Sequence, residues 1–169
     1  SIPSTVKTVD LDGDDLLDFF YVGDMGGQIH RFDINNGNTG GSDLISNPND
    51  TVVAQLGVAG AANVTQAIDR RFFYPPSVAK MQCPQGYCMA LAIGSGWRSN
   101  PTDVSVEEKF YFLMDYEPFT PDQPVITETA TTPDGELALL QALAKVESAD
   151  TITEASNDAR VRGYSLELG

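Results

Sequence analysis

The chain opens with a strand, a short acidic loop and a second strand that runs into a tight turn, and this order most limits its fold. Thr5–Leu11 alternates well enough for a strand, and Phe19–Gly23 is a short apolar run. The residues that follow, Asp24-Met-Gly-Gly27, are strong turn formers, and Gln28–Ile34 resumes β character. We therefore predict three neighbouring strands, the first two joined by the acidic loop.

Similar short apolar runs continue along the chain. Further strands are predicted at Thr51–Leu56, Ser77–Met81, Met89–Ile93, Lys109–Asp115 and Gly163–Leu168. A weak internal similarity joins two units: Val22-Gly23-Asp24 leading to Arg31-Phe32-Asp33 resembles Ile93-Gly94-Ser95 leading to Leu113-Met114-Asp115. The predicted fold class is mainly β, made of partial or modified β-propeller blades.

The chain length bears on how much of a propeller is present. A propeller needs at least about four blades of four strands, and 169 residues are short for that. We therefore expect residues 1–169 to form a single propeller-type domain or a fragment of one.

Two segments between 117 and 149 differ from the β pattern. Glu117–Pro133 holds four prolines and several threonines, which predicts an extended loop within the domain. Asp134–Ala149 places apolar residues at roughly helical spacing behind Pro133-Asp134, which predicts one inserted α-helix around 134–149. The apolar residues of this segment are Leu137, Leu139, Leu140, Leu143, Ala144 and Val146.

Charge excludes some partner classes. The chain has 24 acidic and 10 basic residues, a formal net charge of −14, so its field repels nucleic acid and anionic bilayers. No apolar run approaches the roughly 20 residues of a membrane span. We expect neither nucleic acid as a partner nor a membrane span.

The acidic loop has the spacing of a calcium site. Asp10, Asp12, Asp14 and Asp18 stand at loop positions 1, 3, 5 and 9, and the backbone carbonyl of Leu16 is available at position 7. Calcium takes about six to eight oxygen ligands, and a loop curled round the ion turns alternate residues inward. Magnesium prefers stricter octahedral geometry and zinc prefers nitrogen or sulfur. The pattern predicts Ca²⁺ bound by these five residues.

A plainer interpretation of the same loop is a solvated turn rich in aspartate. Converging carboxylates repel one another by several kcal/mol at short range in a protein-like dielectric, and a bound cation removes that repulsion. The loop also departs from the EF-hand, which has Gly at position 6 and Glu at position 12, where this chain has Asp15 and Tyr21. Leu11 and Leu17 are predicted to anchor the loop to the core.

The two cysteines lie in Cys83-Pro-Gln-Gly-Tyr-Cys88. The proline and glycine between them let the chain turn back, so we predict a local disulfide between Cys83 and Cys88. Free thiols are the alternative, and a zinc site is less favoured because His30 is the only histidine. A disulfide indicates the periplasm or the cell exterior.

The sequence offers little catalytic equipment. His30 suits a surface or packing position in a strand better than a general base, and Gly94-Ser95-Gly96 lacks the context of a nucleophile elbow. Trp97-Arg98 suits packing at a rim better than stacking on a ligand. Asp69-Arg70-Arg71 indicates a local ion pair. We expect a protein that is not an enzyme.

The acidic loop and the hairpin after it together resemble the C-terminal β-propeller of PilY-type proteins, the tip-associated biogenesis factors and adhesins of type IV pili. The resemblance rests first on Asp10-Leu-Asp-Gly-Asp14, Asp18 and Tyr21-Val-Gly-Asp24-Met-Gly-Gly27-Gln-Ile-His-Arg31-Phe-Asp33. Leu91–Arg98, Lys109–Asp115 and Gly163–Leu168 are similar to that family's later blade segments. The family commonly has glycine where this chain has Asp15.

The resemblance implies a single calcium site in this loop, with Asp10, Asp12, Asp14, the Leu16 carbonyl and Asp18 as ligands. It also implies that calcium occupancy governs pilus extension against retraction, and adhesion. Minor pilins at the pilus tip are the implied partners, with a host-cell or surface receptor as a further one. The implied location is the periplasm, the outer membrane or the extracellular pilus tip.

Two other protein classes remain alternatives. An integrin-like propeller uses a similar acidic loop to stiffen blades that bind a protein or glycan ligand. The Arg31-Phe32-Asp33 end of the hairpin argues against this class. A quinone-dependent dehydrogenase also has propeller strands with Tyr-x-Gly-Asp, but the candidate catalytic residues are lacking here.

Overall fold

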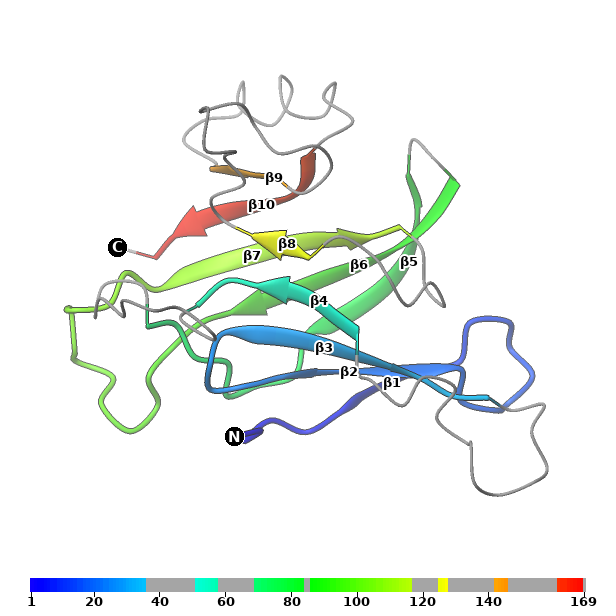
Figure 1. Cartoon of the computed structure of the whole chain (residues 1–169), viewed down its shortest axis with the longest axis horizontal. Coiled ribbons are helices and arrows are strands. Elements are labelled where there is room, and N and C mark those ends of the chain that lie inside the picture. The colour runs from blue at the N-terminus through cyan, green and yellow to red at the C-terminus, as the bar shows by residue number, and fades with distance from the viewer. Residues whose placement is uncertain are drawn as a thin grey trace.

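The structure, a computed structural model, is mainly β in the part of the chain that it describes (Figure 1). It describes residues 1–35, 51–57, 69–83, 86–116, 125–127, 142–145 and 161–168. The strands are β1 (Lys7–Val9), β2 (Phe19–Gly23), β3 (Gln28–Asp33), β4 (Thr51–Gln55), β5 (Ser77–Cys83), β6 (Gly86–Gly94), β7 (Lys109–Asp115), β8 (Ile126–Thr127), β9 (Ala142–Lys145) and β10 (Val161–Glu167).

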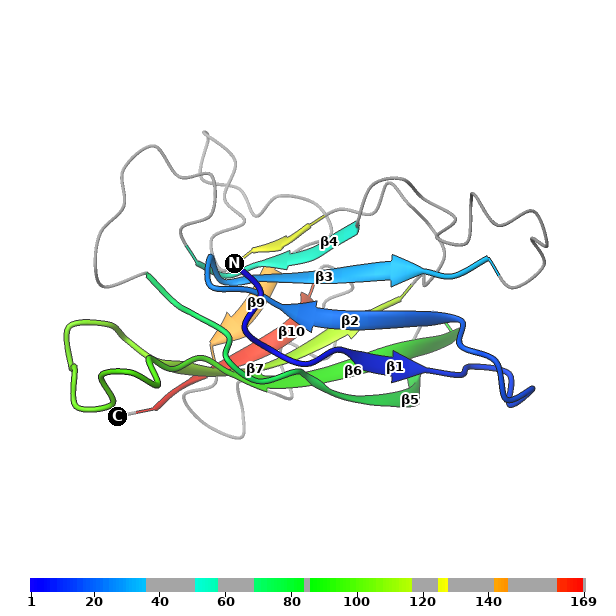
Figure 2. The same cartoon turned by 90° about the horizontal axis from the view of Figure 1, so that it is seen from below.

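The strands form two antiparallel meanders that are joined through short parallel pairs. Their hydrogen-bonded order is β1-β2-β3-β4-β8-β9-β10-β7-β6-β5. The first meander is β1-β2-β3-β4, and the second meander is β5-β6-β7-β10. Figure 2 shows β2, β3 and β4 of the first meander lying over the second meander, while β1 lies beside β5. Each meander therefore has one face turned to the other.

Most of the predicted strands are confirmed. Phe19–Gly23 and Lys109–Asp115 are strands with the predicted bounds. In β7 the buried residues alternate with less buried ones, as expected when a single face of the strand enters the core. The buried face of β7 includes Lys109 and Asp115 at its two ends, so the sheet packing decides which face is buried.

The prediction of a helix around 134–149 is wrong for residues 142–145, which form β9. This strand pairs in parallel with β10 and continues to β8, so sheet contacts outweigh the helical preference of Leu and Ala. The rest of the predicted helix lies outside the described residues. Within the loop predicted at 117–133, Ile126–Thr127 forms β8 beside β4, and the other described residue there is Val125.

The hydrophobic core lies between the two meanders. Tyr21 and Ile29 contribute from the first meander, and Leu91, Tyr111 and Leu113 contribute from the second, all fully buried. Burying each large apolar side chain contributes about 1.5–3 kcal/mol, so this shared layer holds the meanders together. Phe72, in the segment before β5, packs edge-on against Tyr111 with ring centres 6.0 Å apart.

The internal similarity of the sequence corresponds to equivalent positions in the two meanders. The second strands, β2 and β6, end at Gly23 and Gly94. The third strands, β3 and β7, end at Asp33 and Asp115. The two units are thus related in topology as well as in sequence, and each ends its third strand on an aspartate.

The turn between β2 and β3 is pressed against the chain after β4. Gly27 has φ of 77°, and a Cβ on it would stand 2.6 Å from backbone atoms of Gly57 and 3.0 Å from the Arg70 carbonyl oxygen. The Leu56 N–H donates to the Gly27 carbonyl at 2.8 Å. Glycine is required here because both the backbone angle and the close approach exclude a side chain.

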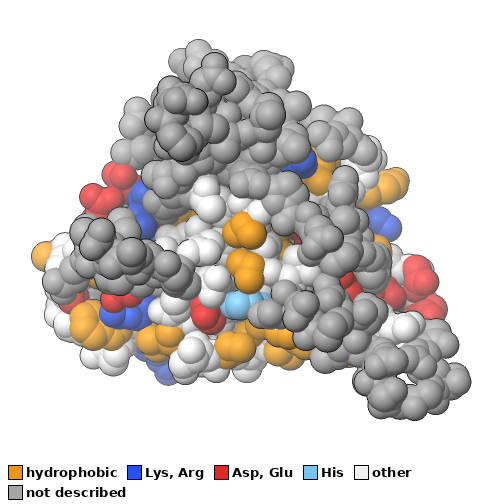
Figure 3. Space-filling view, viewed as in Figure 1, with side chains coloured by type: hydrophobic (Ala, Val, Ile, Leu, Met, Phe, Trp, Pro, Cys, Tyr) orange, Lys and Arg blue, Asp and Glu red, His pale blue; other side chains and the backbone are white. Residues whose placement is uncertain are grey.

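The ends of the meanders carry different features. The acidic loop between β1 and β2 lies at one end, and the segment between β6 and β7 lies at the other, as Figures 1 and 2 both show. Acidic side chains gather at the right-hand edge of the face in Figure 3, where Figure 1 draws the acidic loop. Among the described residues, no helix is long and apolar enough to cross a membrane.

Candidate metal centre

The acidic loop brings three of its carboxylates together. One carboxylate oxygen from each of Asp10, Asp12 and Asp18 lies within 4.8 Å of the others. Two ligands of one calcium ion, each at about 2.3–2.6 Å from it, lie at most about 5.2 Å apart. Three hard oxygen donors at this separation fit one calcium ion, although exposed acidic groups also gather without a metal.

Asp14 lies outside this group of three in the structure. Its Oδ1 accepts the backbone N–H of Leu16 at 2.8 Å. Asp14 and the Leu16 carbonyl stay predicted ligands that the geometry does not test. A carboxylate has lone pairs for both an N–H group and a cation, so this bond does not exclude metal coordination by Asp14.

Hydrogen bonds to the carboxylates shape the loop. Asp10 accepts the N–H groups of Gly13 at 2.7 Å and Asp15 at 3.1 Å, and Asp18 accepts the Leu11 N–H at 2.6 Å. The chain is therefore wrapped round the carboxylates of Asp10 and Asp18. These bonds position the oxygens before any ion enters.

Asp15 has a left-handed backbone, with φ of 68°. Such a φ costs most residues about 1–2 kcal/mol, and Asp tolerates it better than most because of its short polar side chain. Glycine, which the PilY-type pattern commonly has at this position, adopts this conformation without strain. The aspartate at this position is thus compatible with the loop shape that a glycine would give.

The loop is fixed to the first meander at both ends. The Asp18 N–H donates to the Val9 carbonyl at 2.9 Å, and the Asp18 carbonyl accepts the Ile34 N–H at 2.7 Å. Leu11 packs against the core as predicted, but Leu17 does not anchor the loop, because 43% of it is exposed.

A buried polar network joins the two meanders near this end. Arg31 Nη1 donates to Asp115 Oδ2 at 2.7 Å, and the same oxygen accepts the Tyr21 hydroxyl at 2.7 Å. Arg31 also donates to both oxygens of Asp33, at 2.8 and 3.3 Å. All four residues are at least 96% buried. The network crosses the core and ties β2 and β3 to the end of β7.

The surroundings shift two pKa values in this network. Burial raises the pKa of the Tyr21 hydroxyl well above its usual value, and the charge of Asp115 raises it further. Burial alone lowers the pKa of Arg31, but Asp115 and Asp33 outweigh this effect and raise it. Tyr21 therefore stays neutral and Arg31 stays charged in the folded protein.

Sequence reasoning used these residues for family likeness and missed their contacts. Arg31 and Asp115 are 84 positions apart, and their pairing depends on how the meanders face each other. The available signal was a charged residue in each of two predicted core strands, where an unpaired buried charge is unfavourable.

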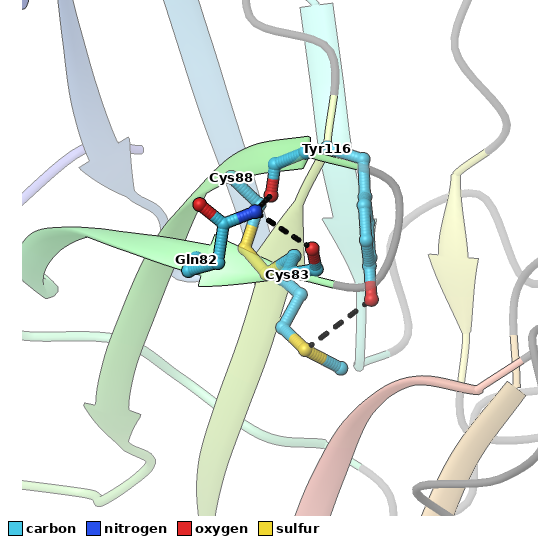
Figure 4. Close-up of a disulfide and its surroundings, with 6 residues drawn as sticks. Gln82, Cys83, Cys88 and Tyr116 are labelled. Atoms are coloured by element: carbon cyan, nitrogen blue, oxygen red, sulfur yellow. Dashed lines mark hydrogen bonds between the residues drawn. A yellow bond between two sulfur atoms is a disulfide. The ribbon is translucent and has the colours of Figure 1, made fainter.

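The disulfide predicted between Cys83 and Cys88 is present (Figure 4). It joins β5 to β6, and the Cα atoms are 5.8 Å apart. The Gln82 side-chain amide donates to the carbonyls of Cys83 and Gly86 at 3.3 and 3.2 Å, which fixes the same turn. Both cysteines are buried, so the bond lies against the protein and not in solvent.

The remaining candidate residues have structural contacts. His30 is 9% exposed, and its Nε2 lies 3.8 Å from Asp24 Oδ2. Its ring also packs near Phe32, which agrees with the packing position predicted for it. The local ion pair predicted at 69–71 forms between Arg71 and Asp69.

The described part of the chain defines a mainly β protein with two facing antiparallel meanders and an acidic loop at one end. The crystal structure of the Pseudomonas aeruginosa PilY1 C-terminal domain is similar, with a TM-score of 0.54 and 16% sequence identity. The match covers 98% of this chain and 38% of that chain. No protein-family model and no curated protein sequence matches this chain. At this identity the likeness concerns the fold.

Proposed function

We propose that this chain is a calcium-binding β-propeller segment of a type IV pilus biogenesis or tip adhesin protein. The observation that carries the proposal is the acidic loop, in which Asp10, Asp12 and Asp18 converge between the first two strands. The fold likeness to the PilY1 domain supports it independently. Each meander is also a four-stranded antiparallel unit, and a propeller blade is built from four antiparallel strands, which supports the proposal.

Calcium would act on the loop and on what the loop touches. An ion between the three carboxylates removes their mutual repulsion. It therefore stabilises the loop conformation in which they converge. The loop is bonded at Asp18 to Val9 and Ile34, so ordering it also steadies the ends of β1 and β3. In this proposal calcium occupancy determines whether the loop and the adjoining strand ends are ordered. Partners bind at this edge of the blade, and calcium thereby regulates pilus extension, retraction and adhesion.

The proposed partners are minor pilins at the pilus tip and a host-cell or surface receptor, in the periplasm or at the extracellular tip. The disulfide supports an extracytoplasmic location, because such bonds persist in oxidising compartments. The protein is proposed to act by binding and not as an enzyme.

A calorimetric titration of Ca²⁺ tests the site. The wild type and Glu107→Ala, an exposed acidic residue outside the loop, are expected to bind one ion alike. Asp10→Ala is expected to abolish the binding, and Asp14→Ala tells whether the predicted fourth carboxylate is a ligand. Mg²⁺ is titrated as a comparison. Absence of heat when Ca²⁺ is added to the wild type contradicts the proposal.

The pilus role needs a separate experiment. Immobilised protein is expected to retain minor pilins from a pilus-tip preparation in calcium and to release them in chelator. Asp10→Ala is expected to behave in calcium as the wild type behaves in chelator. If pilins bind equally in both conditions, the calcium switch is wrong even where the metal site is real.

A further inference from the structure

A second candidate site lies at the end of the meanders opposite the acidic loop. A pocket of about 320 Å³ is formed by the segment before β5 and the segment between β6 and β7. Its lining includes Tyr74, Trp97, Arg98, Asn100, Asp103 and Glu108. The volume is at the small end of the range for small-molecule sites, about 300–1,000 Å³, which suits one small ligand or the end of a longer one.

The polar side chains of the pocket are held in place before any ligand binds. Ser95 donates from its hydroxyl to Glu108, and the same hydroxyl oxygen accepts the Lys109 N–H at 2.9 Å. Asp103 accepts both the hydroxyl and the N–H of Ser105. Those two bonds lower the pKa of Asp103, so it stays an ionised acceptor. The arrangement is preorganised for hydrogen bonding.

The aromatic rings of the pocket already stack with cations. The Arg98 guanidinium lies over Tyr74, 5.8 Å from the ring centre, and the Arg71 guanidinium lies over Trp97 at 4.3 Å. Each ring therefore has a cation on one face. A ligand cation therefore finds one face of each ring already occupied by a guanidinium group. Tyr74 is 61% exposed, so much of its surface remains open to a ligand.

An anionic ligand is also disfavoured. Asp103 and Glu108 line the pocket, and the whole chain carries a formal charge of −14. The two guanidinium groups beside the pocket, Arg98 and Arg71, are already stacked on Tyr74 and Trp97. The remaining chemistry is a neutral ligand with an apolar face for Tyr74 and several hydroxyl groups for Asn100, Asp103 and Glu108.

We propose that this pocket binds the terminal residue of a neutral saccharide. A pyranose has an apolar C–H face that packs on an exposed aromatic ring, and equatorial hydroxyls that bridge planar polar side chains. Tyr74 is the stacking residue, and Asn100, Asp103 and Glu108 are the hydrogen-bonding residues. The site goes beyond the proposed function and does not depend on calcium in the acidic loop.

Saturation-transfer NMR on the wild-type protein tests the site with named probes. The probes are methyl mannoside, methyl galactoside and N-acetylglucosamine, with glucuronate and tetramethylammonium as the charged comparators. At least one neutral sugar is expected to bind at millimolar concentration, and the two charged probes are expected to bind at least tenfold more weakly. Binding of none of the neutral sugars, or preferential binding of a charged probe, overturns the proposal.

Variants then locate the binding. Tyr74→Ala is expected to weaken sugar binding at least tenfold, and Tyr74→Phe is expected to retain it because the ring is kept. The matched control is Tyr87→Ala, which removes another exposed tyrosine stacked by a cation, Lys80, outside the pocket. Equal losses in Tyr74→Ala and Tyr87→Ala contradict the assignment. Asp10→Ala is expected to leave sugar binding unchanged, which separates this site from the calcium proposal.

Discussion

Arg31 in β3 and Asp115 at the end of β7 form a fully buried ion pair, with Nη1 and Oδ2 2.7 Å apart, across the core between the meanders. Both residues are almost completely buried, and they belong to two units that resemble each other in sequence. Asp115 Oδ1 is buried and has no hydrogen-bond partner within the part of the chain that the structure describes. A single oxygen, Asp115 Oδ2, therefore accepts both hydrogen bonds from the first meander, one from Arg31 and one from Tyr21.

Removing one partner of this ion pair is expected to be costly. Asp115→Ala removes the partner of the buried Arg31 across the core and is expected to lower the free energy of unfolding by about 3 kcal/mol. Glu107→Ala serves as the control, because Glu107 is exposed and lies 3.9 Å from Arg70; its expected effect is below about 0.5 kcal/mol. Urea unfolding measures both. A loss under 1 kcal/mol for Asp115→Ala would mean that the pair does not hold the meanders together.

Alkaline pH is expected to weaken the fold through Tyr21. The pKa of Tyr21 is raised in the folded protein, so between about pH 10 and that folded value only the unfolded state loses the proton. Stability from this group is fully present below about pH 10 and then falls by about 1.4 kcal/mol per pH unit. Unfolding followed from pH 8 to 11 checks this. Tyr21→Phe is expected to reduce the slope, and an unchanged slope assigns the effect elsewhere.

Gly27 is expected to tolerate no side chain. Gly27→Ala adds a Cβ 2.6 Å from Gly57 backbone atoms and strains a φ of 77°, so a loss of about 2–4 kcal/mol is expected. Gly13→Ala is the matched control, because its φ is 83° and nothing lies within 4 Å of the added Cβ. Its expected loss is about 1 kcal/mol. Thermal unfolding without calcium compares them, and equal losses would exclude the clash.

The backbone at Asp15 gives a test of the acidic loop. Asp15→Gly keeps the left-handed φ without strain, so calcium affinity is expected to stay within about threefold of the wild type. Asp15→Val disfavours this backbone, and its affinity is expected to fall about tenfold. Calcium titration of the three proteins checks this. Similar weakening in both variants would instead identify the Asp15 side chain as a ligand or water holder.

The disulfide is expected to contribute moderately to stability. Cys83 and Cys88 are five positions apart, and a bond that closes so short a loop is expected to add about 2 kcal/mol. Unfolding with and without reductant measures it, and the Cys83→Ser, Cys88→Ser double variant is expected to match the reduced protein. A reduced wild type as stable as the oxidised one would contradict the estimate.

The local chemistry of the sequence determined a large part of this protein. Short apolar runs and turn residues located β2 and β7 with their observed bounds, and the spacing from Asp10 to Asp18 located the acidic loop. The turn between Cys83 and Cys88 predicted the disulfide. These features depend on interactions between residues that are close in the chain, so a short stretch of sequence is enough to predict them.

The tertiary structure decided what depends on distant residues. Ala142–Lys145 follows a helical pattern in sequence and forms a strand because β10 offers it a pairing edge. Arg31 meets Asp115 only because the two meanders face each other, and Tyr74 meets Arg98 only because the segment before β5 lies against the segment between β6 and β7. Short-range preferences are about 1 kcal/mol or less per residue, and the contacts between distant strands outweigh them.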